Sequence, residues 1–314
     1  MKQLPAGGLL GTLLVAAGAV LLASKGLFAK SLYAQGLNHN DVAAIRSVLA
    51  VPGFWVVALV LHGNPKSLSR AHAHSHAHIQ KHCLPPADVL GAMLAGLLCY
   101  YCGALANFYA LSLIQASVER ALLFSYPAMV IVFHALWTRE RPATSTLVSV
   151  ALTSFGVLLV TGAADQSLTQ QQLIGVGWVL FCSVTIAIYF MMSASLTQRL
   201  GSGNFTAVAM TTAGVAFLLH YQLQGPTRWL SIPPDAIAQM LGLVLFATIL
   251  PLVCVAEGVR RIGAARGSIM STLGPPATAG MAFFLLGERL SCAQLSGMVI
   301  IVASITFLEL RQRR

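Results

Sequence analysis

Four charged side chains fall inside apolar stretches of the sequence: Lys25, Arg46, Glu119 and Arg120. A charge at the centre of a lipid-exposed helix costs roughly 2.5–3.5 kcal/mol, so charges in such stretches are functional candidates. One hypothesis is a solute pathway in which they hold an anionic or zwitterionic molecule. The alternative is a set of ion pairs that fix helix ends, with the lysine extending toward the membrane surface.

The two hypotheses differ most at Arg46 and Glu119. Both residues are expected near the outer ends of their helices, so the two side chains could meet. A structural ion pair is slightly favoured, because each charge would be costly if left unpaired in an apolar helix. If they pair, truncating either residue would strand the other charge. The other interpretation is that Arg46 binds an anionic group on the solute.

Several polar groups in apolar stretches are weaker candidates for the same pathway. Glu257 lies close to Arg260 and Arg261, which favours a local ion pair over a coupling carboxylate. Pro127 and Pro275 fall near the middle of apolar stretches, where each would free the carbonyl four residues earlier, at Leu123 and Ser271. The full set of additional candidates is Tyr101, Asn107, Tyr126, Tyr189, Glu257 and Ser271.

A histidine-rich segment could bind metal through His72, His74, His76 and His78. Alternate side chains of an extended chain point the same way, and neutral imidazoles bind zinc, nickel or copper. A metal exporter would also need ligands within the membrane, such as His and Asp one helical turn apart, and the sequence offers none. The favoured interpretation is a cytoplasmic loop without an essential role, with a regulatory metal site as the alternative.

Composition places the chain in a bilayer. Hydrophobic residues make up 57% of its 314 positions and charged residues only 9%, against about 25% charged in soluble domains. The basic residues lie in short connections and form no stripe, so we expect lipid as the partner and no nucleic acid. Five of the six cysteines fall in apolar runs, which argues against a disulfide framework.

Ten apolar stretches are long enough to cross about 30 Å of hydrocarbon as helices. They are residues 7–29, 41–62, 88–112, 118–137, 144–162, 173–196, 204–222, 235–257, 267–286 and 292–310. The fold class is therefore an all-α membrane protein with ten transmembrane helices, the first of which is retained.

Lysine and arginine concentrate in the connections on one side. That side holds Lys2, Lys66, Arg70, Lys81, Arg139, Arg141, Arg199, Arg260, Arg261, Arg266, Arg311, Arg313 and Arg314, against Lys30, Arg120, Arg228 and Arg289 on the other. The positive-inside rule predicts a multi-pass protein of the plasma (inner) membrane with both termini in the cytoplasm.

The two halves of the chain carry matching landmarks. Pro127 precedes Glu140 by the same distance as Pro275 precedes Glu288, and the two sets lie 148 residues apart. Five spans in each copy would insert the second copy upside down, which is a transporter architecture with its site between the repeats. The predicted units are residues 7–162, including the histidine-rich loop at 63–87, and an inverted copy at 173–310.

These segments resemble the EamA family of the drug/metabolite transporter superfamily. The resemblance is carried by SKGLFAK at 24–30, NFYAL at 107–111, ASVERALLFSYP at 116–127, LGP at 273–275 and GERL at 287–290, with Arg46, Gln294 and Gly297. It implies two inverted five-helix EamA repeats around a central cavity, and export of small organic solutes. Asn107 stands where a subgroup of the family is expected to have an acidic residue.

The sequence thus predicts a secondary transporter, an exporter or facilitator of small organic metabolites such as amino acids or related solutes. The alternative is a metal-handling protein that uses the histidine-rich loop. An enzyme is disfavoured, because neither a His-Glu-x-x-His nor a Gly-x-Gly-Asp motif occurs and no carboxylates are paired within spans. There is no phosphate-binding loop and no cofactor is expected; the sequence leaves monomer and dimer open.

Overall fold

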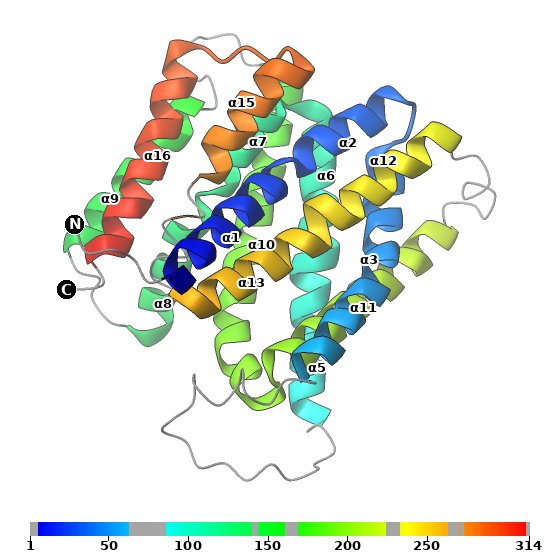
Figure 1. Cartoon of the computed structure of the whole chain (residues 1–314). Coiled ribbons are helices and arrows are strands. Elements are labelled where there is room, and N and C mark those ends of the chain that lie inside the picture. The colour runs from blue at the N-terminus through cyan, green and yellow to red at the C-terminus, as the bar shows by residue number, and fades with distance from the viewer. Residues whose placement is uncertain are drawn as a thin grey trace.

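The computed structural model describes residues 6–62, 86–139, 144–160, 169–223, 233–262, 270 and 273–311. Within these ranges the chain forms helices joined by short turns, and no strand occurs (Figure 1). The four candidate histidines of the loop and the candidate Ser271 lie outside the described residues.

Each of the predicted apolar stretches contains helix, and several helices extend beyond the predicted bounds. In chain order they are α1 (Ala6–Ala23), α2 (Lys25–Ala34), α3 (His39–His62), α5 (Pro86–Gly96), η1 (Leu97–Gly103), α6 (Ala104–Leu113), α7 (Ala116–Leu123), α8 (Tyr126–Thr138), α9 (Thr144–Val160), α10 (Gln170–Leu200), α11 (Ser202–Leu223), α12 (Pro234–Val244), η4 (Leu245–Ile249), α13 (Leu250–Ile262), α15 (Gly274–Leu286) and α16 (Cys292–Arg311). Among the described residues six helical segments are long and apolar enough to cross a membrane, and three apolar helices are shorter.

Two of the apolar stretches contain a break. The stretch at 7–29 is interrupted at Ser24. The Ser24 hydroxyl donates a hydrogen bond to the Leu21 carbonyl at 2.6 Å and so competes with the helical hydrogen bonds. The stretch at 118–137 is interrupted at Phe124 and Ser125, and α8 then starts with Pro127 in its first turn. Pro127 therefore begins a helix rather than kinking one. The predicted freed carbonyl at Leu123 accepts a hydrogen bond from Ser183 at 3.4 Å.

Helices in the two halves begin at matching positions. The starts of α5 and α12, of η1 and η4, of α8 and α15, and of α9 and α16 are each 148 residues apart. The elements η1 and η4 are π-helical turns, which are rare and which interrupt the apolar helices α5–α6 and α12–α13 at the same place. The repeat thus extends to an unusual local geometry.

The core consists of helix pairs that join one half to the other. In Figure 1, α1 lies along α13 and α9 along α16, and α3 packs on α11 while α6 packs on α10. Glycines allow close approach: a methyl group added at Gly258 would lie 2.7 Å from the Gly11 carbonyl oxygen, and one at Gly297 would lie 2.7 Å from that of Gly156. Small residues at contacts are how helices pack tightly in lipid.

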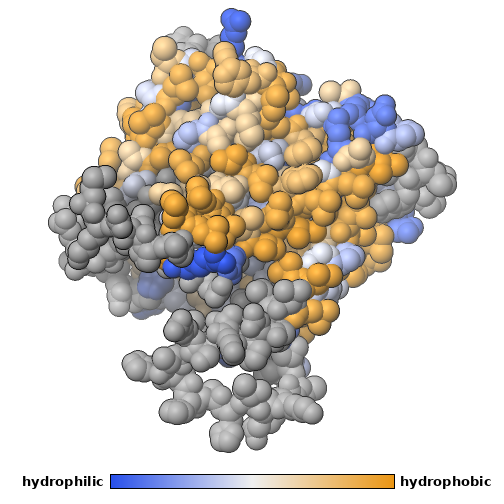
Figure 2. Space-filling view, viewed as in Figure 1, coloured by the Kyte–Doolittle hydropathy of each residue, from blue (hydrophilic) through white to orange (hydrophobic). Residues whose placement is uncertain are grey.

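Apolar side chains dominate the outside of the molecule. Figure 2 shows them gathered over the face formed by α1, α12 and α13. On other helices Trp137 is 83% exposed and Phe284 82% exposed. Such continuous apolar surface would be unstable in water, and it matches a protein whose solvent is lipid.

Candidate functional site

A chain of polar contacts joins three helices of the first half. Asn107 on α6 accepts a hydrogen bond from Lys25 on α2 and donates one to Glu119 on α7. Lys25 Nζ and Glu119 Oε1 are 3.7 Å apart. Glu119 is only 1% exposed and Asn107 only 2%, so this is a buried, charge-balanced network.

The local backbone explains how Lys25 reaches this network. The break at Ser24 makes Lys25 the first residue of α2. Gly26 then allows α2 to approach α7, because a methyl group added there would lie 3.0 Å from the Ala116 side chain. Thr278 on α15 donates to the Ala23 carbonyl at 3.2 Å, so the second half satisfies a carbonyl next to the break.

The helix that carries Glu119 is fixed at its start by the second half. The Glu288 carboxylate accepts hydrogen bonds from the Ala116 amide at 2.8 Å and from the Ser117 amide at 3.2 Å. It also accepts one from the Ser117 hydroxyl at 2.6 Å. A carboxylate at a helix N-terminus is favourable, because it satisfies free amides and the helix dipole.

Arg46 does not take part in the ion pair. Its guanidinium Cζ lies 5.2 Å from the centroid of the Phe108 ring, and Lys25 Nζ lies 5.7 Å from the same ring. The side chain is buried, and Nε has no hydrogen-bond partner among the described residues. The favoured pairing of Arg46 with Glu119 was therefore wrong: within the described part of the chain, Glu119 is paired with Lys25.

Arg120 faces the second half. Its Cζ lies 5.4 Å from the Phe124 ring centroid, and its buried Nε has no partner among the described residues. A methyl group added at Gly274, the first residue of α15, would lie 3.1 Å from Arg120 Nη2. The guanidinium is therefore in direct contact with the start of a helix.

The tyrosine candidates belong to two other groups. Tyr189 accepts a hydrogen bond from Tyr100 at 2.9 Å, and Tyr126 stacks on Phe190 with ring centroids 5.3 Å apart. The Tyr101 hydroxyl lies 2.8 Å from His220 Nδ1. Tyr101 is thus separate from the charged network.

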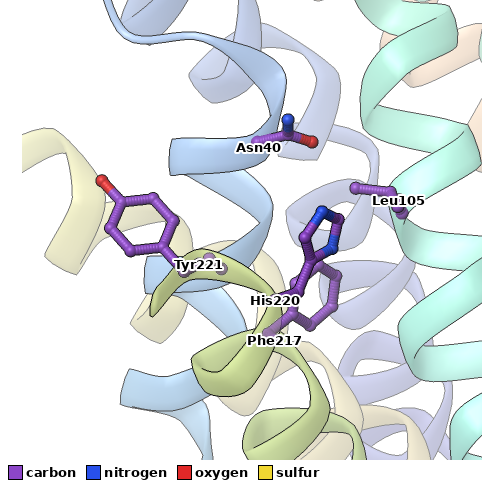
Figure 3. Close-up of a pocket in the computed structure, with 6 residues that line it drawn as sticks. Asn40, Leu105, Phe217, His220 and Tyr221 are labelled. Atoms are coloured by element: carbon purple, nitrogen blue, oxygen red, sulfur yellow. The ribbon is translucent and has the colours of Figure 1, made fainter. Parts of the chain in front are cut away.

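A small pocket adjoins Tyr101 at the ends of α3, α6 and α11. Figure 3 shows Asn40, Leu105 and His220 facing a common space, with the ring of Tyr221 pointing away. It measures about 160 Å³, part of which is open to the outside. Almost none of this space is wide enough for a water molecule, so the pocket has no room for an organic solute.

Comparison with known proteins decides the family. The profile of the EamA-like transporter family matches residues 9–162 and 173–310, which is most of the chain in two copies. The chain belongs to the EamA-like transporter family. It is 30% identical over 306 residues to the uncharacterized transporter YcbK of Bacillus subtilis, covering 96% of this chain and 93% of that one.

Two further proteins are more distantly similar to this chain. The uncharacterized inner membrane transporter YicL of Salmonella typhimurium is 24% identical over 201 residues, covering 64% of this chain and 66% of that one. A crystal structure of a protein 16% identical in sequence superposes with a TM-score of 0.62 and covers 97% of this chain and 98% of that one. At that identity the likeness establishes the fold alone.

The remaining candidates of this EamA-like transporter are dispersed. Glu257 Oε1 forms an ion pair with Arg261 Nη2 at 2.7 Å, one turn along α13. No group of three or more His, Cys, Asp or Glu side chains in the described ranges could hold a metal ion. The cysteines described, Cys99, Cys102, Cys182, Cys254 and Cys292, are free thiols.

Sequence reasoning missed residues that act through tertiary contacts. Glu288 was treated as a landmark of the repeat, although it fixes the start of α7. Phe108 lies next to the candidate Asn107 and contacts both Lys25 and Arg46 through its ring. The NFYAL segment contained that signal, because an aromatic residue beside a buried polar one can contact cations.

Proposed function

We propose that this EamA-like transporter is a secondary carrier of small organic metabolites, such as amino acids or related solutes, across the inner membrane. The buried network of Lys25, Asn107 and Glu119 carries the proposal. It lies in the first half but next to α15 of the second half, which is where an inverted-repeat transporter binds its solute. A soluble scaffold or a purely structural membrane protein would gain little from burying such groups.

The proposal includes a topology. Ten helices would cross the membrane, the second repeat would be inverted relative to the first, and both termini would be cytoplasmic, as the distribution of lysine and arginine supports. Single cysteines at Asn38 and Gln198 test it in a cysteine-free variant. An impermeant reagent applied to intact cells should label the first and spare the second; the reverse pattern would invert the topology.

Transport itself is tested in vesicles. Purified protein is reconstituted in proteoliposomes preloaded with a mixture of unlabelled amino acids, and counterflow of each labelled amino acid is measured. We expect accumulation of at least one, and a loss of more than tenfold in Glu119→Gln. Arg289→Gln is the control, because Arg289 is exposed in the turn before α16 and has no described contact with the network. Equal accumulation of the labelled amino acids in preloaded vesicles that lack the protein would refute the proposal.

A further inference from the structure

We propose that Arg120 and the N-terminus of α15 bind an oxyanion of the transported solute, a carboxylate or phosphate group. This rests on the proposed function and adds to it the chemical class of the solute.

The first observation is the start of α15. The helix begins at Gly274, which is buried, and its N-cap residue Leu273 supplies no side-chain hydrogen bond. Pro275 and Pro276 have no amide hydrogen, so the Gly274 amide is the donor that this first turn offers, and the helix dipole makes this end positive. Such an end favours an anion.

The second observation is independent and concerns Arg120. This side chain is 7% exposed, its Nε has no hydrogen-bond partner among the described residues, and its Nη2 lies against Gly274. A cation held against the positive end of a helix is unfavourable unless an anion binds beside both. A guanidinium is planar and can donate two parallel hydrogen bonds, which suits a carboxylate or phosphate.

The neighbouring carboxylate does not neutralise Arg120. Glu119 Oε1 accepts from Asn107 and lies 3.7 Å from Lys25, so its charge is balanced by the lysine. Among the described residues no ion pair joins Arg120 to any carboxylate. Within the described part of the chain, Arg120 is therefore a buried positive charge with no ion-paired carboxylate.

A third unsatisfied group lies at the other half-helix. Ser125 is the N-cap residue of α8, is 4% exposed, and its hydroxyl has no hydrogen-bond partner among the described residues. Helices α8 and α15 begin at equivalent positions of the two repeats. Paired half-helix N-termini that point at an anionic substrate group are a known device of inverted-repeat carriers.

The first test uses the wild-type protein. Purified protein is melted in detergent with succinate, inorganic phosphate or L-phenylalanine, and with the neutral or cationic analogues succinamide and L-phenylalanine amide, at constant ionic strength. We expect at least one anionic probe to raise the melting temperature by several degrees and its amide to have no effect. If no anionic probe stabilises the protein, or the amides stabilise it equally, the proposal is wrong.

The second test uses Arg120→Gln with Arg289→Gln as the matched control. Arg120→Gln should raise the half-saturating concentration of the stabilising anion at least tenfold, whereas Arg289→Gln should leave it unchanged. Without ligand, Arg120→Gln should melt at or above the wild-type temperature, because an uncompensated buried charge has been removed. If Arg120 were purely structural, Arg120→Gln would lower the melting temperature without ligand and would leave the response to anions intact. Either result would overturn the proposal.

The two proposals can fail separately. If counterflow is absent for all amino acids and anions tried, the transport function fails whatever the melting data. If solutes are transported but their amides are transported equally well, only the anion site fails. Should Arg120→Gln not fold, Arg120→Lys keeps the positive charge but lacks the two parallel N–H donors of the guanidinium. An unchanged anion affinity in that variant would also contradict the proposal.

Discussion

The two halves have matching helix positions but differ in the polar side chains that they bury. Gly11 on α1 packs against Ile262 on α13, and Gly175 on α10 packs against Ile114 after α6. The two isoleucines are 148 residues apart, like the helix starts, so Gly11 and Gly175 are equivalent positions. The same helix contact is therefore built twice.

The charged candidate residues of the first half align with uncharged residues in the second half. Lys25 aligns with Tyr189 and Arg46 with Met210 at the same spacing as Gly11 and Gly175. Asn107 aligns with Val255 at the 148-residue spacing. In the same frame Glu119 and Arg120 correspond to Gly267 and Ser268 in the sequence. Duplication explains the scaffold, whereas the buried charged residues among those described, Arg46, Asp88, Glu119 and Arg120, all lie in the first half. The buried charges are thus asymmetric on a repeated scaffold.

The largest effect is expected from breaking the charged network. Glu119→Gln leaves the Lys25 ammonium buried without its carboxylate, which should cost about 3–5 kcal/mol of unfolding free energy. The double variant Lys25→Met with Glu119→Gln should recover most of the loss, measured as melting temperature in detergent. Strictly additive effects of the two single variants would mean that the pair does not interact.

The equivalent position of the second half provides the contrast. Tyr189→Phe removes a neutral hydrogen bond from Tyr100, which should cost only about 0.5–1.5 kcal/mol. A loss as large as that of Glu119→Gln would contradict the view that only the first half depends on charge.

The shared scaffold predicts equal effects in the two halves. A methyl group at Gly11 would lie 2.5 Å from Ile262 Cγ2, and one at Gly175 would lie 2.7 Å from Ile114 Cγ2. Gly11→Ala and Gly175→Ala should each cost about 1–3 kcal/mol through overpacking. Gly177→Ala is the control on α10, because nothing lies within 4 Å of its added methyl group, and it should be neutral or stabilising. Loss of stability in only one of the two variants would break the proposed equivalence.

The smallest effect is expected at the contact between the halves. Glu288→Gln weakens the carboxylate cap of α7 and should cost about 1 kcal/mol. Hydrogen exchange at the amides of Ala116 and Ser117 should accelerate, whereas Arg289→Gln should leave it unchanged. Unaltered exchange in Glu288→Gln would show that the cap does not hold the start of α7.

Much of the scaffold could be predicted because apolarity and proline are local signals. Each predicted stretch contains helix, six helical segments among the described residues are long and apolar enough to cross a membrane, and the Leu123 carbonyl has the partner that a buried acceptor requires. The partner of Glu119 could not be predicted, because sequence spacing does not say which helices touch. The sequence favoured Arg46 as this partner, whereas the break at Ser24 and the close approach at Gly26 bring Lys25 to Glu119 instead.

The π-helical turns were missed for a physical reason. They fall in segments that are apolar on every side, such as LLCYYCG at 97–103, so a change of helical period leaves no mark in the hydrophobic pattern. Functional sites were predicted by residue type alone, which found Arg120 but not its contact with the start of α15. That contact joins positions far apart in the sequence, and only the fold brings them together.

The matching π-turns also bear on the history of the chain. A widened turn of this kind accommodates an extra residue in a helix, and two independent insertions would rarely fall at the same place. Because η1 and η4 begin at Leu97 and Leu245, with the repeat's own spacing, we infer that the widened turn was already present in a single ancestral five-helix unit. The widened turn thus belongs to the part of the molecule that both halves keep, whereas Lys25, Asn107 and Glu119 belong to the part in which they differ.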